Sequence, residues 1–275
     1  MSWVYESNEI EDMANLTGVP TKVVTVLGSA AASYLFLDYF SGGKCESSAT
    51  MEGKTVLITG CNTGIGKETA KDLSKRGAKI VMACRNLELA EAAAKEVKEA
   101  GQGQVSVMKL DLASLDSVRA FAQEYNAKEE RLDVLINNAG VMLLPDKTHT
   151  ADGYEMTIGV NHLGHFLLTN LLLDKLRASK PSRIVNVSSL AHEKGKMDLT
   201  DLNYATKPWD SMGAYRQSKL ANVLFSRQLE KLLPKVSTHC SKPRFFVQKL
   251  KKKVNLTENF EFRIIKKFSN FQIFA

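Results

Sequence analysis

Short apolar runs alternate with longer amphipathic or Ala/Glu/Lys-rich stretches along most of the chain. The short runs predict buried β-strands, and the stretches between them predict helices. The expected strands are 54–59, 78–83, 104–110, 132–137 and 183–187. The expected helices are 65–76, 87–100, 115–125, 154–178 and 213–233. Apolar strands that alternate with helices indicate an α/β domain, in which a doubly wound parallel sheet is covered by helices on both faces.

The first 40 residues have a different pattern. Residues 1–22 are polar and carry a net negative charge, whereas residues 23–37 carry no charge. An uncharged run of this length is shorter than the roughly 20 residues that span a bilayer. Apolar neighbours extend it over residues 19–40 if Lys22 and Asp38 reach toward the headgroups. One hypothesis is therefore a membrane anchor over residues 19–40, and the alternative is an amphipathic or buried helix that packs on the domain.

The charge of the chain is unevenly distributed. Residues 41–52 are small and polar and predict a linker, so that residues 53–233 form the main domain. The net charge is +7 over 275 residues, but residues 235–275 alone carry +8, which leaves −1 for the rest. The basic character belongs to the tail at 234–275, and we expect no nucleic-acid partner for the domain.

The four cysteines are widely spaced. Cys45, Cys61, Cys84 and Cys240 form no CxxC pair, so we expect neither a zinc site nor any other metal site built on them. A disulfide framework is equally unexpected, and this pattern suits a reducing compartment. We interpret Cys61 and Cys84 as small buried apolar residues.

A glycine-rich turn follows the first expected strand. Gly60, Gly64 and Gly66 lie in TGCNTGIG, between that strand and the first expected helix. Glycine permits a tight turn and a close approach of the backbone to a pyrophosphate, and the helix N-terminus offers free N–H groups to phosphate. A purely structural turn is the alternative. The strand–turn–helix context favours a dinucleotide site.

The end of the second expected strand indicates which dinucleotide would bind. An NAD site usually has Asp or Glu there, about 20 residues after the glycines, to bind the ribose 2′-hydroxyl. This chain has Ala83-Cys84-Arg85-Asn86 instead. A guanidinium suits a 2′-phosphate, so Arg85 favours NADP, with a solvated surface charge as the alternative.

Candidate catalytic residues lie in the second half of the domain. Tyr215 and Lys219 are four residues apart on one expected helix, and therefore on one face of it. A tyrosine with an ordinary pKa near 10 is a poor base at neutral pH, and a neighbouring ammonium lowers that pKa. Ser188 and Ser189 end the fifth strand, and Asn137–Gly140 ends the fourth. Ligands of parallel sheets bind at these carboxyl ends.

These strings together resemble a known family. TGCNTGIG, NNAG, Asn161, RIVNVSS and YRQSK, in this order, resemble the short-chain dehydrogenase/reductase family. ACRN, VNHLGHFLLTNLLL and YRQSKLANVLF are similar to the retinol dehydrogenases of the microsomal and mitochondrial type. The resemblance covers residues 53–233 and implies a Rossmann-type fold. It also implies NADP-dependent interconversion of a lipophilic, retinol-like alcohol and its aldehyde or ketone.

The resemblance assigns a role to each candidate. Tyr215 would be the general acid/base, Lys219 would assist it and orient the nicotinamide ribose, and Ser189 would hold the substrate oxygen. Asn161 would support a water relay from Lys219, with satisfaction of backbone groups as its alternative role. The implied cofactor-binding residues, besides Tyr215 and Lys219, are Gly60, Asn62, Gly64, Ile65, Gly66, Arg85, Asp111, Leu112, Asn138, Ala139 and Gly140.

Other residues near these motifs have open interpretations. Met142, Leu143 and Leu144 either line a lipophilic substrate pocket or pack in the core. We interpret His162, His165 and His192 as structural and not as catalytic residues. With an anchor at residues 19–40, the interpretation is a membrane-associated protein, in the endoplasmic reticulum rather than the mitochondrion. The oligomeric state stays open.

The tail departs from the family pattern. Residues 234–275 have no Pro-Gly dipeptide, and the chain has no glycine after Gly213. We therefore expect the sheet to lack the last two strands of the family and the loop over the nicotinamide. The alternative function that follows is a truncated, catalytically inactive cofactor-binding or interaction protein.

Overall fold

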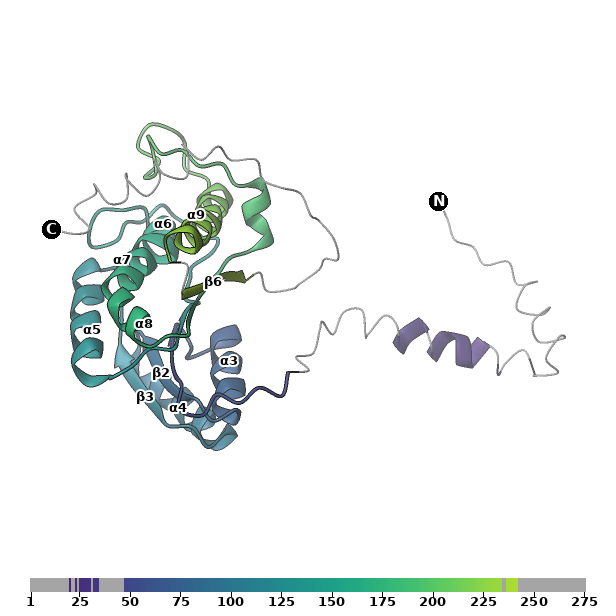
Figure 1. Ribbon diagram of the computed structural model, residues 1–275. Helices are drawn as coiled ribbons and strands as arrows, with labels where there is room; N and C mark the ends of the chain where they lie inside the picture. Colours follow the sequence, from purple (N-terminus) through teal and green to yellow (C-terminus); the bar gives the residue numbers. More distant parts are fainter. Residues whose placement is uncertain are drawn as a thin grey trace. The chain divides into compact units, whose positions relative to one another are not determined.

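The computed structural model describes residues 20, 23, 25–30, 32–34, 47–233 and 236–241. Its main unit contains one parallel sheet with the strand order β3-β2-β1-β4-β5-β6 (Figure 1). The strands are β1 (Thr55–Thr59), β2 (Lys79–Cys84), β3 (Val105–Lys109), β4 (Val134–Asn137), β5 (Ser182–Val187) and β6 (Val236–Ser241). This order brings the ends of β1 and β4 together in the middle of the sheet, where the chain direction of the crossovers reverses.

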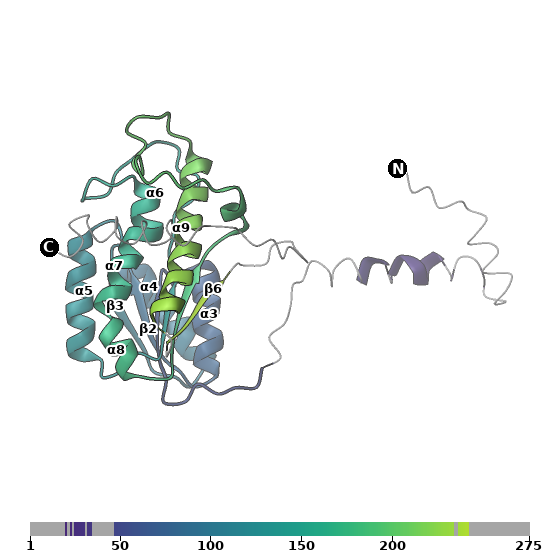
Figure 2. The ribbon, with the colours of Figure 1, turned by 45° about the horizontal axis from the view of Figure 1, so that its top comes forward.

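Helices cover both faces of the sheet. They are α3 (Gly64–Lys75), α4 (Leu87–Ala100), α5 (Leu115–Lys128), α6 (Met156–Ile158), α7 (Gly164–Leu171), α8 (Leu173–Ala178) and α9 (Ser211–Leu232), with a π-helical turn η1 (Gly159–Leu163) and a 3₁₀ helix η2 (Leu190–Lys194). In Figures 1 and 2, α3 lies across the sheet from α5 and α7. The expected doubly wound, Rossmann-type architecture is confirmed.

Two apolar clusters form the core, one on each face. Alternate residues of a strand point to opposite faces, so Val56 and Ile58 of β1 pack with α3 and α4, whereas Leu57 packs with α5, α7 and α9. Cys61 and Cys84 are buried in the first cluster, as interpreted from the sequence. Helices pack on both faces of the sheet, so a site can form at its carboxyl edge instead.

The predicted strands and helices correspond closely to observed elements, except over residues 154–178. A single helix over 154–178 is expected, but the structure divides this segment into α6, η1, α7 and α8. At η1 the N–H of Gly164 donates to the carbonyl of Gly159, five residues back. One extra residue in a helical turn leaves the apolar periodicity nearly unchanged, so the pattern did not reveal it.

The sixth strand corrects an expectation from the sequence. β6 pairs in parallel with β5 from Ser182↔Val236 to Val187↔Ser241. The prediction that the sixth strand is missing is therefore wrong. Val236 is buried in the same apolar cluster as Leu229 and Leu233 of the preceding segment, so β6 buries an apolar residue at the end of the sheet. The seventh strand concerns residues 242–275, which lie outside the described residues.

The described part of the N-terminal unit is helical. The N–H of Val23 donates to the carbonyl of Pro20, and the Ser29 hydroxyl donates to the carbonyl of Val26. Val26 and Leu27 are exposed, with relative accessibilities of 64% and 63%. In the described ranges, no helix combines the length and the apolarity that a membrane crossing requires.

Replacement of Val236 tests the packing of β6. Val236 is 4% exposed, so Val236→Ala should lower the free energy of unfolding by about 2 kcal/mol, through lost burial and a residual cavity. Ser237 points to the exposed face of the same strand, and Ser237→Ala should change it by less than about 0.5 kcal/mol. Urea denaturation measures both values. Equal, small effects would show that β6 does not pack on α9.

Candidate active site

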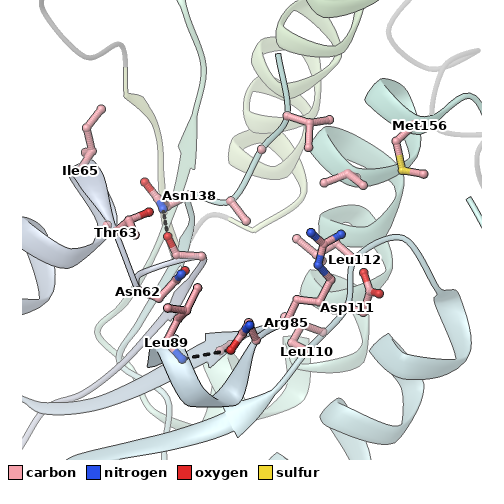
Figure 3. Close-up of a pocket in the computed structure, with 18 of the residues that line it drawn as sticks. Asn62, Thr63, Ile65, Arg85, Leu89, Leu110, Asp111, Leu112, Asn138 and Met156 are labelled. Atoms are coloured by element: carbon pink, nitrogen blue, oxygen red, sulfur yellow. Dashed lines mark hydrogen bonds between the residues drawn. The ribbon is translucent and has the colours of Figure 1, made fainter. Parts of the chain in front are cut away.

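The carboxyl edge of the sheet borders a cavity of about 780 Å³ (Figure 3). Its lining comes mainly from the turns after β1, β2, β3 and β4, together with α6 and η1. The lining residues are Gly60, Asn62, Thr63, Ile65, Gly66, Ala83, Arg85, Asn86, Leu89, Leu110, Asp111, Leu112, Asn138, Ala139, Gly140, Val141, Leu144, Thr148, Met156 and Val160. Ten of the eleven residues that the resemblance assigns to the cofactor alone are in this set. The exception, Gly64, is the first residue of α3. A cavity of this size can hold a dinucleotide-sized ligand in part or whole.

Glycine is required at two positions of the first turn. Gly60 has φ +62°, and a Cβ there would lie 2.7 Å from the Cβ of Ala139. A Cβ on Gly66 would lie 2.5 Å from Nδ2 of Asn138 and 2.8 Å from the carbonyl oxygen of Gly60. The space that these side chains would fill is occupied by the turn after β4, so any larger residue would separate the two turns.

Asn138 fastens these turns to each other. Its Nδ2 donates to the carbonyls of Thr59 (2.9 Å) and Gly60 (3.0 Å). In return, Oγ1 of Thr59 accepts the N–H groups of Asn138 and Ala139, both at 3.0 Å. Sequence reasoning assigned Asn138 to the cofactor and did not single out Thr59. Its place as the last residue of a buried strand, one before the glycine turn, was the available signal.

His165 extends this contact to α7. Its Nε2 lies 2.8 Å from Oγ1 of Thr59, and its Nδ1 lies 3.2 Å from the carbonyl oxygen of Asn161. Burial lowers the pKa of His165 to about 3, so the ring is neutral. Because Thr59 already accepts two N–H groups, its hydroxyl donates to Nε2, and Nδ1–H donates to Asn161.

The N-terminus of α3 is open toward the cavity. Asn86, Ser114 and Asp210 cap α4, α5 and α9 with side-chain oxygens. Within the described residues, Thr63 makes no such bond at the start of α3, and the first turn of α3 contains no acidic residue. Free N–H groups and the positive end of the helix dipole suit an anion there. Lys67, in contrast, is bound to Glu96 of α4, with Nζ 3.0 Å from Oε1.

The end of β2 supplies the cationic part of the cavity. Arg85 is exposed and follows the buried residue Cys84. Figure 3 shows Arg85, Asp111 and Leu112 among the residues around this part of the cavity. Oδ1 of Asp111 accepts the N–H of Ala113 at 2.9 Å, which fixes the turn after β3. An arginine at this position leaves the cavity without an acidic partner on β2 for a ribose hydroxyl.

Tyr215 and Lys219 lie on one face of α9, as the spacing predicts. Nζ of Lys219 is 5.6 Å from the centre of the Tyr215 ring. Lys219 is buried and donates to the carbonyl oxygen of Val187, at the end of β5, over 3.1 Å. Burial lowers the pKa of Lys219 to about 8. A Cβ on Gly140 would lie 3.5 Å from this ammonium, so Lys219 lies next to a residue that lines the cavity, although Tyr215 and Lys219 are not themselves in its lining.

The two serines after β5 have different environments. Ser188 is buried, and its hydroxyl donates to the carbonyl of Lys219 at 2.8 Å. Ser189 is half-buried, and its Oγ accepts the N–H of Ala191 at 3.2 Å. Nδ1 of His192 lies 2.6 Å from the carbonyl oxygen of Ser189 and holds its backbone. The Ser189 hydroxyl proton is thus available to another acceptor, whereas the Ser188 proton is already used.

Asn161 binds the chain after β4 to α9. Its side chain exchanges two hydrogen bonds with the backbone of Val141, at 2.7 and 2.9 Å, and donates to Oγ of Ser218 at 3.0 Å. A Cβ on Gly140 would lie 3.0 Å from its Oδ1. The side chain thus occupies its own hydrogen-bonding groups with backbone and Ser218. The water relay assigned to Asn161 stays a prediction.

The segment after Val141 resolves an open alternative. Leu144 lines the cavity. Met142 and Leu143 are 54% and 51% exposed, so they do not pack in the core. Leu143 also has a positive φ of 53°, which is strained for a leucine. Core packing is therefore excluded for Met142 and Leu143, and Leu144 is the one residue of the three in the cavity lining.

A family model for short chain dehydrogenases matches residues 54–259. The chain belongs to the short chain dehydrogenase family. The match extends beyond residue 233, where the sequence motifs end, and includes β6.

Several relatives similar to this chain are retinol dehydrogenases. Retinol dehydrogenase 13 of Homo sapiens is 56% identical over 212 residues, which are 76% of this chain and 64% of that protein. Retinol dehydrogenase 14 of Mus musculus is 53% identical over 235 residues, which are 79% of this chain and 69% of that protein. The chain spans less than two thirds of the length of the retinol dehydrogenase 13 proteins of human and mouse.

Solved structures share the fold. A putative uncharacterized protein from Mycobacterium paratuberculosis is 43% identical with a TM-score of 0.65, over 74% of this chain and 72% of that one. A metagenomic short-chain oxidoreductase in complex with NADP is 29% identical with a TM-score of 0.59, over 73% of this chain and 85% of that one.

Proposed function

We propose that this short chain dehydrogenase is an NADP(H)-dependent oxidoreductase that interconverts a lipophilic, retinol-like alcohol and its aldehyde or ketone. One observation carries the proposal: the buried Lys219, paired with Tyr215 on α9, meets the glycine-lined cavity at Gly140. A dinucleotide site and a proton-transfer pair thereby share one edge of the sheet. The relatives named retinol dehydrogenases favour the same reaction class.

The cavity fits a nicotinamide dinucleotide phosphate. The open N-terminus of α3 and the turn containing Gly60 and Gly66 would hold the pyrophosphate, because backbone N–H groups can approach it without side chains between. Arg85 would bind the 2′-phosphate, and Asp111 and Leu112 would contact the adenine. When bound, NADPH supplies the hydride of the reduction.

The residues of the chain would manage the proton. The Tyr215 hydroxyl donates a proton to the carbonyl oxygen during reduction and takes it back during oxidation. The Lys219 ammonium stabilises the phenolate and binds the nicotinamide ribose. The Ser189 Oγ accepts the Ala191 N–H through a lone pair. Its hydroxyl proton can therefore be donated to the same substrate oxygen. A lipophilic substrate would approach past Leu144, Met156 and Val160, which line the cavity.

The N-terminal segment is proposed to bind a membrane. Val26 and Leu27 are exposed apolar residues of a helix, within the segment 19–40 that the sequence singles out. Burial of such side chains in lipid is favourable, and a retinol-like substrate would itself be in the membrane. We propose the endoplasmic reticulum as the location.

Replacement of Arg85 tests the cofactor. Arg85→Ala should raise the Kd for NADPH roughly 10- to 100-fold and leave the Kd for NADH unchanged, because one charge-assisted contact to the 2′-phosphate is lost. Arg76→Ala is the control, since it removes a guanidinium that is bound to Asp72 at the far end of α3. Titration calorimetry measures both cofactors. Equal affinities of the parent for NADPH and NADH would contradict the assignment.

Replacement of Tyr215 tests the chemistry. Tyr215→Phe should lower kcat for retinaldehyde reduction roughly 100- to 10,000-fold, with little change in the Kd for NADPH. Tyr125→Phe is the control, because its hydroxyl binds the carbonyl of Arg131 away from the cavity. A parent chain that binds NADPH but turns over no aldehyde would instead support an inactive cofactor-binding protein.

Carbonate extraction tests the membrane proposal. The full chain should stay with the membrane pellet, whereas a chain that begins at Thr50 should be released. A full chain with Val26→Glu and Leu27→Glu should also be released, because two charges at these positions oppose insertion into the apolar phase. Release of the unaltered chain would sink the proposal.

A further inference from the structure

Asn222 lies one helical turn after Lys219 on α9 and is 4% exposed. Its Nδ2 donates to two backbone carbonyls, that of Asn161 at 3.1 Å and that of Val187 at 3.3 Å. Its Oδ1 lies 3.0 Å from Nδ1 of His162. One buried amide therefore binds α9, the end of β5 and the π-helical turn η1.

His162 fixes the orientation of this amide. Burial lowers the pKa of His162 to about 4, so the ring is neutral. The ring packs between Phe166 and Phe225, with centroid distances of 6.1 and 5.8 Å. Because both donors of the Asn222 amide point to carbonyls, its oxygen must accept, and Nδ1–H of His162 donates to it. The amide cannot turn over without losing three hydrogen bonds.

Both carbonyls that Asn222 binds belong to the site. The carbonyl of Val187 also accepts the Lys219 ammonium. A carbonyl oxygen has two lone pairs, and here one serves Lys219 while the other serves Asn222. Asn161 is in η1, and its own side chain binds the carbonyl of Val141 and Oγ of Ser218. The amide thus connects the carbonyl that binds Lys219 to Asn161, the residue that lies next to Gly140.

We propose that Asn222 is a positioning residue for Lys219, a role that rests on the proposed oxidoreductase function. By sharing the Val187 carbonyl, it keeps the ammonium from being drawn onto that oxygen alone. One ammonium donor is used at the Val187 carbonyl, which leaves two for the Tyr215 hydroxyl and the nicotinamide ribose of the proposed function. By holding the Asn161 carbonyl, it keeps η1, and with it Gly140, at a fixed distance from α9.

The test compares Asn222→Leu with a matched variant in the full chain. Leucine has a similar volume but no donor. Ser226→Ala removes buried hydrogen bonds one turn further along α9, to Nδ2 of Asn186 and the carbonyl of Asn222, without touching the Lys219 contacts. For retinaldehyde reduction, Asn222→Leu should lower kcat about 10- to 100-fold, as a displaced catalytic group does. The KM and the Kd for NADPH should change less than about threefold.

A solvent isotope effect distinguishes positioning from general loss of structure. In Asn222→Leu, proton transfer becomes slower than the other steps, so the ratio of kcat in H₂O to kcat in D₂O should rise above that of the parent. In Ser226→Ala it should stay at the parent value, even if the melting temperature falls equally. Equal losses of kcat in both variants, or an unchanged isotope effect, would overturn the proposal.

A titration of Lys219 by NMR needs no turnover. The titratable groups that face its ammonium are Tyr215 on α9, His165 on α7 and Cys240 on β6. In Asn222→Leu the Lys219 pKa should rise from about 8, because the Val187 carbonyl then serves the ammonium alone. An unchanged pKa overturns the positioning role. If the Lys219 pKa is raised in Asn222→Leu but the parent chain turns over no substrate, only the oxidoreductase function is contradicted.

A second variant covers the case in which Asn222→Leu does not melt cooperatively. Asn222→Ser keeps one short donor and a smaller volume. It should lower kcat with the same isotope effect and retain NADPH binding. Full activity of a folded Asn222→Ser variant would overturn the proposal.

Discussion

The hydroxyl of Thr59 joins three elements at the edge of the sheet that carries the site. Its oxygen accepts the N–H groups of Asn138 and Ala139, and its proton is donated to His165. His165 passes a hydrogen bond on to the carbonyl of Asn161. Thr59, Asn161 and His165 are buried, and leaving a buried polar group unpaired costs about 1–3 kcal/mol. The turn after β1, the turn after β4 and the helix after η1 therefore cannot move independently, and the cavity between them has a defined shape.

A second polar chain crosses the sheet behind the site. Nδ2 of Asn137 donates to Thr169 of α7 (3.0 Å) and to Asn186 of β5 (2.7 Å), and Asn186 donates to Ser226 of α9 (2.9 Å). Apolar packing alone tolerates sliding of a helix over a sheet, whereas directional bonds between buried amides permit one alignment. This chain connects β4 and β5 to α7 and to the C-terminal half of α9.

Most of the residues that line the cavity could be predicted because their signals are local. The glycine turn, the open helix start and Arg85 are consecutive or nearly consecutive features, and their chemistry follows from backbone geometry and charge. Asn222 and Thr59 gave no comparable signal. Their partners are 61 and 106 residues away in the sequence, in Asn161 and His165. The local sequence pattern does not predict with which distant carbonyl or ring a buried amide or hydroxyl will form a hydrogen bond.

The sequence by itself determined the strand and helix pattern from β1 to β5 and the i, i+4 placement of Tyr215 and Lys219. Burial periodicity and helix geometry act over a few residues and can be recognised in the chain. Only the tertiary structure decided that β6 forms, that residues 159–163 make a π-helical turn, and that Lys67 binds Glu96 of α4. A polar end strand, one extra residue in a turn and the choice of an ion-pair partner each depend on which surface the rest of the fold presents.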